Sequence, residues 1–218
     1  MDNEVLKANP TKKFLSQRIL LYCGLISSIL YVITDLISSS QYPGYSIADQ
    51  NYSELLATGA PTRNFLLVVS VFYNLLVAAF AIGILNAKIP GRTARVTGIV
   101  MIAYAALSMI TPAFFQMDMR GAEVTVLGSL HPPMTAIMSL FILLSMGFGA
   151  FISNKWFRYY SFTTIVIVCI FGLLTSLQVP ELSANLPTPW MGLKERVNIY
   201  LTMLWFALAS ITLLQKQK

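Results

Sequence analysis

Six long apolar stretches, separated by polar segments, dominate the pattern of this chain. They cover residues 19–37, 65–87, 97–115, 133–153, 160–178 and 197–214, and none of them contains lysine or arginine. A helix needs about 20 residues to cross a hydrocarbon core about 30 Å thick. Strand-like alternation of apolar and polar residues is absent, which argues against a membrane barrel. The pattern therefore predicts an all-α bundle of six transmembrane helices, forming one integral membrane domain over residues 1–218.

The polar segments between these stretches fall into two sets that differ in charge. The tails and the short connections at residues 88–96 and 154–159 hold two acids, Asp2 and Glu4, against a larger set of bases: Lys7, Lys12, Lys13, Arg18, Lys88, Arg92, Arg95, Lys155, Arg158, Lys216 and Lys218. The longer connections, residues 38–64, 116–132 and 179–196, hold most of the acids. Lysine and arginine stay on the cytoplasmic side during insertion. We therefore predict a multi-pass protein of the cell membrane with both termini cytoplasmic and the long loops outside.

Composition agrees with a membrane protein and narrows its partners. Hydrophobic residues make up 56% of the chain and charged residues 11%, whereas a soluble domain carries about 25% charged residues. The net charge of +6 does not call for nucleic acid, because positive charge in cytoplasmic loops already accounts for it. Acidic headgroups of membrane lipids are the expected partners of those bases. Cys23 and Cys169 both lie in apolar stretches, so we expect neither a stabilising disulfide nor a thiolate metal site.

Polar side chains recur at helical spacing on five of the stretches and are densest toward the predicted outer ends. Residues three or four apart share a helix face, and the sets are Ser28, Tyr31, Asp35 and Ser38; Ser70 and Asn74; Tyr104, Ser108 and Thr111; Thr135 and Ser139; and Glu195, Asn198, Thr202 and Trp205. We predict that these faces line a cavity that opens outward, with Asn74 about 15 Å deep at its floor. The alternative is that the small polar residues only join helices through hydrogen bonds.

Charged and polar residues near the predicted cavity are the candidates for ligand contacts. A carboxylate within the membrane is costly unless it is paired or turned inward, so Asp35 is predicted to face the interior within reach of Arg196 or Arg63. Arg196 can instead grip a phosphate or carboxylate through a bidentate contact. Tyr45, in the first long loop, and Asn74 complete the predicted ligand-binding set.

The long loops also contain three candidates for acid–base catalysis, Glu54, Asp118 and His131. His131 precedes two prolines, which predict the start of the fourth helix and place the histidine at its outer mouth. Histidine titrates near neutral pH, which suits proton transfer. A metal site of Asp118, Glu123 and His131 is an alternative. No paired-histidine motif accompanies it, so neither a metal nor another cofactor is predicted.

Four charged or titratable side chains from three different loops lie close to the predicted mouth of the cavity. They are Glu54, Asp118, His131 and Arg196. Because an isolated charge beside an apolar span is costly, we expect these four to lie within mutual hydrogen-bond or single-water reach. Residues 53–56, between two turn signals, are expected to form one or two helical turns on the membrane surface.

Short motifs in the long loops resemble those of a known family. The first loop contains Pro43-Gly44-Tyr45-Ser46, Ser53-Glu54-Leu55 and Gly59-Ala60-Pro61, Asp118 and His131 precede the fourth helix, and Gly192-Leu193 and Glu195-Arg196 precede the sixth. Over roughly residues 20–214 this combination resembles the domain-of-unknown-function 998 family, with Tyr52 standing where an aliphatic residue is expected. The resemblance implies a six-helix membrane protein of prokaryotic type and brings no assigned activity.

Three classes of function are compatible with these features. The first is a protein that binds or transports a lipid or small amphiphile from the outer side. The second is a membrane enzyme that performs acid–base chemistry on a lipid of the outer leaflet. The third is a non-catalytic scaffold subunit. We favour the first, because it needs a cavity but no catalytic set, whereas a close carboxylate–histidine contact would favour the enzyme.

Overall fold

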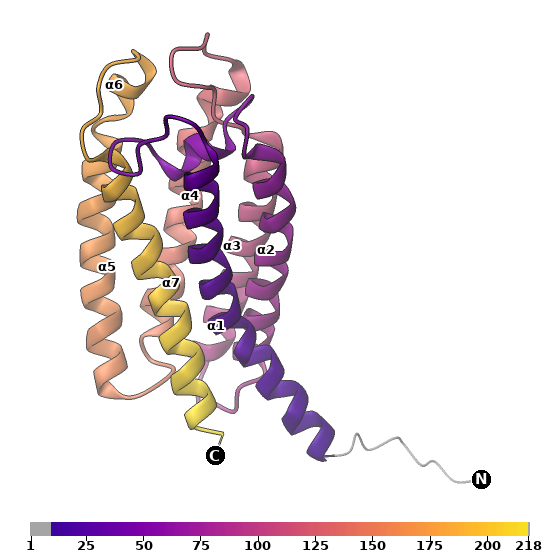
Figure 1. Cartoon of the computed structure of the whole chain (residues 1–218). Coiled ribbons are helices and arrows are strands. Elements are labelled where there is room, and N and C mark those ends of the chain that lie inside the picture. Colours follow the sequence, from indigo (N-terminus) through magenta and orange to yellow (C-terminus); the bar gives the residue numbers. More distant parts are fainter. Residues whose placement is uncertain (1–9, 218) are drawn as a thin grey trace.

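The computed structural model describes residues 10–217 and is helical throughout its regular parts (Figure 1). Six long helices follow one another along the chain: α1 (Pro10–Gln41), α2 (Arg63–Leu85), α3 (Thr93–Phe114), α4 (Val126–Gly149), α5 (Lys155–Ser176) and α7 (Met191–Gln215). Two short helices, η1 (Tyr52–Leu56) and α6 (Val179–Ser183), lie in the long connections. No strand occurs within residues 10–217. The predicted all-α fold with six long helices is confirmed.

All six long helices have the length and apolar composition needed to cross a membrane. Their outward sides carry large exposed hydrophobic side chains, such as Ile29, Phe72 and Leu173. A water-soluble protein rarely exposes apolar surface on this scale, whereas lipid tails solvate it well. The protein is therefore a multi-pass membrane protein.

The two ends of the bundle differ in the length of their connections. The three long connections, residues 42–62, 115–125 and 177–190, lie together at the top of Figure 1, which we call the loop end. The start of α1 and the end of α7 lie at the opposite, tail end. That the loop end faces outward and the termini face the cytoplasm stays a prediction. Asp2, Glu4, Lys7 and Lys218, used in that charge argument, lie outside the described residues.

The bundle core is built around α7, which packs between α1 and α5. Trp205 and Phe206 are fully buried there, and the Trp205 indole nitrogen donates a hydrogen bond to Ser161 Oγ of α5 at 2.9 Å. A Cβ atom on Gly149 of α4 would lie 2.6 Å from the Trp205 ring. A glycine at that position is what allows α4 to approach α7 so closely at the tail end.

The helices α4 and α5 are packed at the tail end and separate toward the loop end. The buried residues of α4 are Ile142, Ser145, Met146 and Gly149, all in its second half. Those of α5, from Phe157 to Val168, all lie within its first 14 of 22 residues, toward the tail end. Since α4 packs mainly on α3 and meets α5 and α7 only sparsely, the loop-end halves of α4 and α5 leave space beside α7.

The predicted start of the fourth helix is wrong. The two prolines lie inside α4, which begins at Val126, seven residues before the predicted start at Pro133. Thr125 caps this earlier start, because its Oγ1 accepts a hydrogen bond from Gly128 N at 3.0 Å. A local cap satisfies the first helical amides, so the chain is already helical when it reaches the prolines. His131 therefore lies on the helix itself and not at its mouth.

The first long connection does contain the predicted short helical segment. It is the 3₁₀ helix η1, and it begins one residue earlier than expected, at Tyr52. The segment does not rest only on the surface, because the Tyr52 ring lies 5.0 Å from that of Tyr31 in α1. The loop thus inserts a side chain between the helices at the loop end.

Candidate functional site

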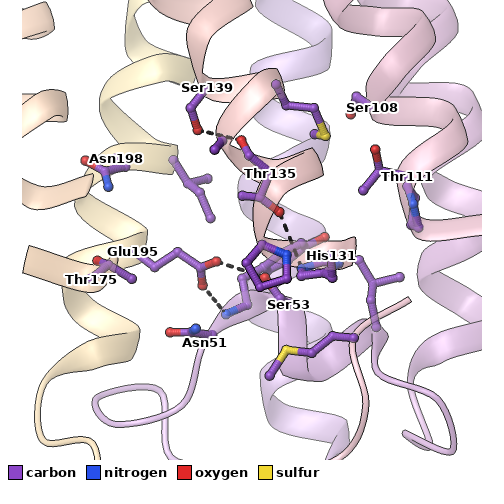
Figure 2. Close-up of a pocket in the computed structure, with 18 of the residues that line it drawn as sticks. Asn51, Ser53, Ser108, Thr111, His131, Thr135, Ser139, Thr175, Glu195 and Asn198 are labelled. Atoms are coloured by element: carbon purple, nitrogen blue, oxygen red, sulfur yellow. Dashed lines mark hydrogen bonds between the residues drawn. The ribbon is translucent and has the colours of Figure 1, made fainter. Parts of the chain in front are cut away.

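The loop-end half of the bundle encloses a cavity of about 900 Å³. Volumes of about 300–1,000 Å³ are typical of small-molecule sites. Part of its polar lining comes from the helix faces identified in the sequence, namely Tyr31, Ser70, Asn74, Tyr104, Ser108, Thr111, Thr135, Ser139, Glu195, Asn198 and Thr202. Several of these side chains point inward from different walls in Figure 2. Helical periodicity therefore located a large part of the polar lining, while the separation of α4 from α5 decided that there is a space to line.

Aromatic rings form one wall of the cavity. Tyr31 lies 5.0 Å from Tyr52 and 5.1 Å from Tyr73, measured between ring centroids. Tyr73 is joined to Tyr104 by a 3.3 Å contact between their hydroxyl oxygens. All four tyrosines line the cavity. Only Tyr31 and Tyr104 stand out in the sequence, as members of polar stripes, since Tyr52 reaches this wall through the path of the loop.

Asn74 lines the cavity as predicted and is fully buried. Its amide nitrogen donates to the Ser70 carbonyl at 2.8 Å. Its amide oxygen has no hydrogen-bond partner within residues 10–217. An unpaired buried acceptor is costly, and this oxygen is shielded from the cavity, because no part of Asn74 is accessible.

Glu195 is the acidic residue of the cavity that the sequence did not single out as a site residue. Its carboxylate, on the fifth residue of α7, accepts hydrogen bonds from the Tyr52 backbone amide and from Ser53 Oγ, the latter at 3.0 Å (Figure 2). It forms no ion pair within the described part of the chain. The signal for it was present, because Glu195 lies three residues before Asn198 on the same polar stripe.

His131 faces the cavity from α4 (Figure 2). Its Nδ1 lies 2.8 Å from the Phe115 carbonyl oxygen, which can only accept, so Nδ1 carries the proton. In the neutral ring Nε2 is then an acceptor, and Thr135 Oγ1 lies 3.5 Å from it. No hydrogen bond joins this ring to a carboxylate among the described residues. His131 ties α4 to the end of α3 and offers one acceptor to the cavity.

Asp118 acts as a cap for the start of α4. Its carboxylate accepts from the Thr125 backbone amide at 2.8 Å and from Thr125 Oγ1 at 2.9 Å. A negative charge near the first helical amides is favourable because of the helix dipole. Helix capping is therefore a sufficient structural role for Asp118, although the residue also lines the cavity.

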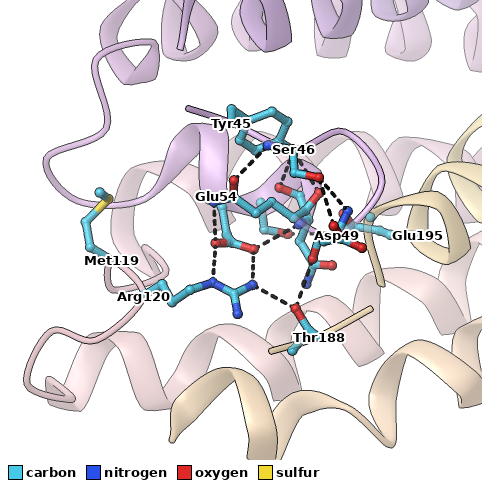
Figure 3. A network of polar contacts seen from close by, with 12 residues as sticks. Tyr45, Ser46, Asp49, Glu54, Met119, Arg120, Thr188 and Glu195 are labelled. Carbon is cyan, nitrogen blue, oxygen red and sulfur yellow. Dashed lines mark hydrogen bonds and ion pairs between the residues drawn. The ribbon is translucent and has the colours of Figure 1, made fainter. Parts of the chain in front are cut away.

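Glu54 and Arg120 form a hydrogen-bonded ion pair that joins the three long connections above the cavity (Figure 3). Arg120 Nη2 and Nε lie 2.9 and 3.1 Å from the two oxygens of Glu54. The same guanidinium donates to Thr188 Oγ1 and to the Leu186 carbonyl. Four of the five N–H donors of Arg120 are therefore used within the protein, and the residue holds the loops together above the cavity.

Asp35 and Arg196 form a second ion pair deep beneath the first loop. Arg196 Nη2 and Nε lie 2.8 and 2.9 Å from the two Asp35 oxygens. The Asp35 side chain is 1% exposed and the Arg196 side chain 4%. The predicted pairing of Asp35 with Arg196 is confirmed. Arg196 Nη1 donates to the carbonyls of Ile47 and Gln50, so the pair also anchors the loop to α7.

Tyr45 completes this anchor. Its hydroxyl accepts from Arg196 Nη2 at 3.0 Å and donates to the carbonyls of Gln50 and Asn51. Burial raises the pKa of the Tyr45 phenol, and the neighbouring Arg196 only partly offsets that effect. The hydroxyl therefore keeps its proton and its role as a donor near neutral pH.

The amino-acid sequence matches a known protein family. A family model described as "Protein of unknown function (DUF998)" matches residues 25–212. The chain belongs to the DUF998 family. The matched region reaches from α1 to α7 and includes every residue of the cavity and of both ion pairs. No curated protein and no solved structure gives a significant match to the chain.

The four residues predicted to cluster at the cavity mouth make no direct hydrogen bonds with one another in this DUF998 protein. Glu54 pairs with Arg120, Asp118 with Thr125, and Arg196 with Asp35, and no hydrogen bond joins any two of Glu54, Asp118, His131 and Arg196. Glu54 and Arg196 are neutralised, as expected, but by partners outside the predicted cluster, whereas Asp118 is hydrogen-bonded to the uncharged Thr125. The choice of partner depends on how the loops cross above the bundle, which spacing along the chain does not reveal.

Only one of the four residues predicted to bind a ligand lines the cavity. Asn74 lines the cavity of this DUF998 protein, whereas Asp35, Tyr45 and Arg196 do not. Those three are engaged with one another and with loop carbonyls, so a structural role accounts for them. The alternative metal triplet does not assemble, since no group of three or more His, Cys, Asp or Glu in residues 10–217 is placed to hold a metal ion.

Proposed function

We propose that this protein binds or transports a lipid or other small amphiphile in the cavity at its loop end. The observation that carries the proposal is the combination of a polar end and an apolar side in one cavity. Glu195 and His131 contribute polar atoms, while Leu140 and Leu173 contribute apolar surface. An amphiphile matches both parts at once, because its headgroup needs hydrogen bonds and its chain needs an apolar environment.

The separation of α4 and α5 supports an entry route from the bilayer. Leu140 of α4 and Leu173 of α5 line the cavity and are 53% and 62% exposed. They lie on the side where α4 and α5 are least packed. An alkyl chain can lie between these helices with little loss of contact with lipid, and the headgroup then sits beneath the loops.

The enzymatic alternative has less support. Neither Glu54 nor Asp118 hydrogen-bonds to His131, and each is engaged elsewhere. General acid–base catalysis needs a group free to exchange a proton with the substrate. The scaffold alternative does not account for a cavity of about 900 Å³ that keeps a buried, unpartnered amide oxygen.

A large side chain in the cavity should weaken binding of an amphiphile. Ser139→Trp places a large side chain at a cavity-lining position of α4, whereas Ile137→Trp alters an exposed position of the same helix that does not line the cavity. With dodecylglycerol, a neutral single-chain amphiphile, we expect Ser139→Trp to weaken binding by about tenfold or more, equivalent to about 1.4 kcal/mol. Native mass spectrometry of protein released from lipid nanodiscs measures the bound fraction. Equal binding by both variants would reject the cavity as the site.

Entry from the outer leaflet requires the loop end to face outward. In a background with both natural cysteines replaced by alanine, we expect Ser183→Cys to react with a membrane-impermeant maleimide in intact cells. Arg92→Cys, on the short connection between α2 and α3, should react only after permeabilisation. The reason is the excess of bases at the tail end, including Lys88, Arg92 and Lys155, which favours the cytoplasm. The reverse labelling pattern would invert the topology.

A further inference from the structure

We infer that the headgroup recognised in this cavity is an ammonium group, so that the preferred ligand is a cationic or amine-bearing amphiphile. This inference rests on the proposed function and adds the chemistry of the headgroup to it. Its basis is the combination of a carboxylate without a base and a wall of aromatic rings. Both features favour a positively charged group, and together they disfavour an anion.

The charges around the cavity leave a negative excess. Among the charged residues that line it, Arg120 is neutralised by Glu54. Glu195 and Asp118 also line it, and neither forms an ion pair within residues 10–217. Nearby Arg196 is neutralised by Asp35. The basic side chains that would hold a phosphate or carboxylate are therefore already occupied.

The carboxylate of Glu195 can accept further hydrogen bonds. An ionised carboxylate offers about four acceptor positions, and Glu195 uses two of them, for the Tyr52 amide and Ser53 Oγ. A partly buried carboxylate gains from a cation that brings its own hydrogens or its own charge into contact. A ligand anion at this place would meet repulsion that nothing in the lining offsets.

The aromatic wall provides the second element of an ammonium site. Tyr31 stands between Tyr52 and Tyr73, with ring centroids 5.0 and 5.1 Å away, and the Tyr31–Tyr73 pair meets edge to face. Rings at different angles around one space are the usual arrangement for binding quaternary ammonium groups, which are attracted to ring faces within about 6 Å. The Tyr52 backbone amide binds Glu195, so the carboxylate lies next to this wall.

Asn74 lies at the depth of the tyrosine wall. Asn74 is eleven residues into α2, and Tyr31 is ten residues from the loop end of α1, which puts both roughly 15 Å below the ends of their helices. Asn74 lines the same cavity, and its Oδ1 has no partner among the described residues. An ammonium group in this cavity is therefore held by Glu195 and the tyrosine wall, above Asn74, whose oxygen is not accessible.

The experiment compares three amphiphiles with the same dodecyl chain and different headgroups. The full-length protein in nanodiscs is titrated with dodecyltrimethylammonium, dodecylglycerol or dodecyl sulfate, and bound ligand is counted by native mass spectrometry. We expect the ammonium compound to bind at least about tenfold more tightly than the sulfate. Glu195→Gln should remove most of that preference, whereas Glu123→Gln, at an exposed loop residue that does not line the cavity, should retain it.

A second variant tests the aromatic wall independently of the carboxylate. Tyr31→Leu should weaken binding of dodecyltrimethylammonium about tenfold, and the matched variant Tyr22→Leu, at an exposed position of the same helix, should not. Equal affinities for the three headgroups, or an unchanged preference in both Glu195→Gln and Tyr31→Leu, would overturn the ammonium assignment while leaving amphiphile binding intact. Failure of all three compounds to bind would overturn the proposed function, and the ammonium assignment with it.

Discussion

Replacing Asp35 with alanine is expected to destabilise the protein by about 3–5 kcal/mol, which is typical of removing one partner from a buried ion pair. Arg196 would remain buried with its hydrogen bonds to Tyr45 and to the loop carbonyls but without a counter-charge. The Tyr200 hydroxyl, which donates to Asp35 at 2.6 Å, would also lose its acceptor. Thermal unfolding of the purified protein in detergent, followed by tryptophan fluorescence, measures the loss.

Two controls separate the ion pair from a general effect of substitution. Glu123→Ala removes an exposed loop carboxylate and should leave the unfolding temperature nearly unchanged. The double variant with Asp35→Ala and Arg196→Met should recover part of the stability lost in Asp35→Ala, because it removes the unpaired buried charge. A single Asp35→Ala variant as stable as the natural protein would show that the pair does not anchor the loop.

Substitution of Gly192 by alanine is expected to produce the second large effect. A Cβ atom at this position would lie 2.5 Å from the Ile47 carbonyl oxygen and would also meet the Gln50 backbone. Both obstacles are backbone atoms, so the loop must move away from the first turn of α7. That movement breaks the contacts that Arg196 makes with the same two carbonyls. We expect a loss of about 1–3 kcal/mol, in the range for overpacking.

Gly147→Ala is the matched control for this prediction. Gly147 lies in α4, and a Cβ atom there would have no neighbour within 4 Å. Alanine favours the helix over glycine by about 1 kcal/mol, so this variant should be as stable as the natural protein or slightly more so. The same thermal measurement compares the two variants. If the Gly192→Ala and Gly147→Ala proteins have the same unfolding temperature, the loop at residues 46–51 adapts to the added methyl group without loss of stability.

Local properties of the sequence were sufficient for the six helices and for the orientation of their polar faces. The length of an apolar stretch decides whether it can cross a membrane, and helical periodicity decides which residues share a face. For this reason Tyr104, Ser108 and Thr111 on α3, and Thr135 and Ser139 on α4, were correctly assigned to common faces, and these faces line the cavity. The inward orientation of Asp35 followed from the cost of an unpaired carboxylate in lipid.

Contacts between distant segments depended on the path of the loops, which local patterns do not encode. Nothing near Glu54 in the sequence distinguishes Arg120 from Arg196 as its partner, yet the crossing of the connections brings Arg120 to it. The same crossing carries Tyr52 to Tyr31 and Glu195 to the η1 segment. The cavity itself exists because α4 and α5 pack only at the tail end. Residue spacing therefore determined which side chains can face the interior, and tertiary packing decided which of them meet and where space remains between them.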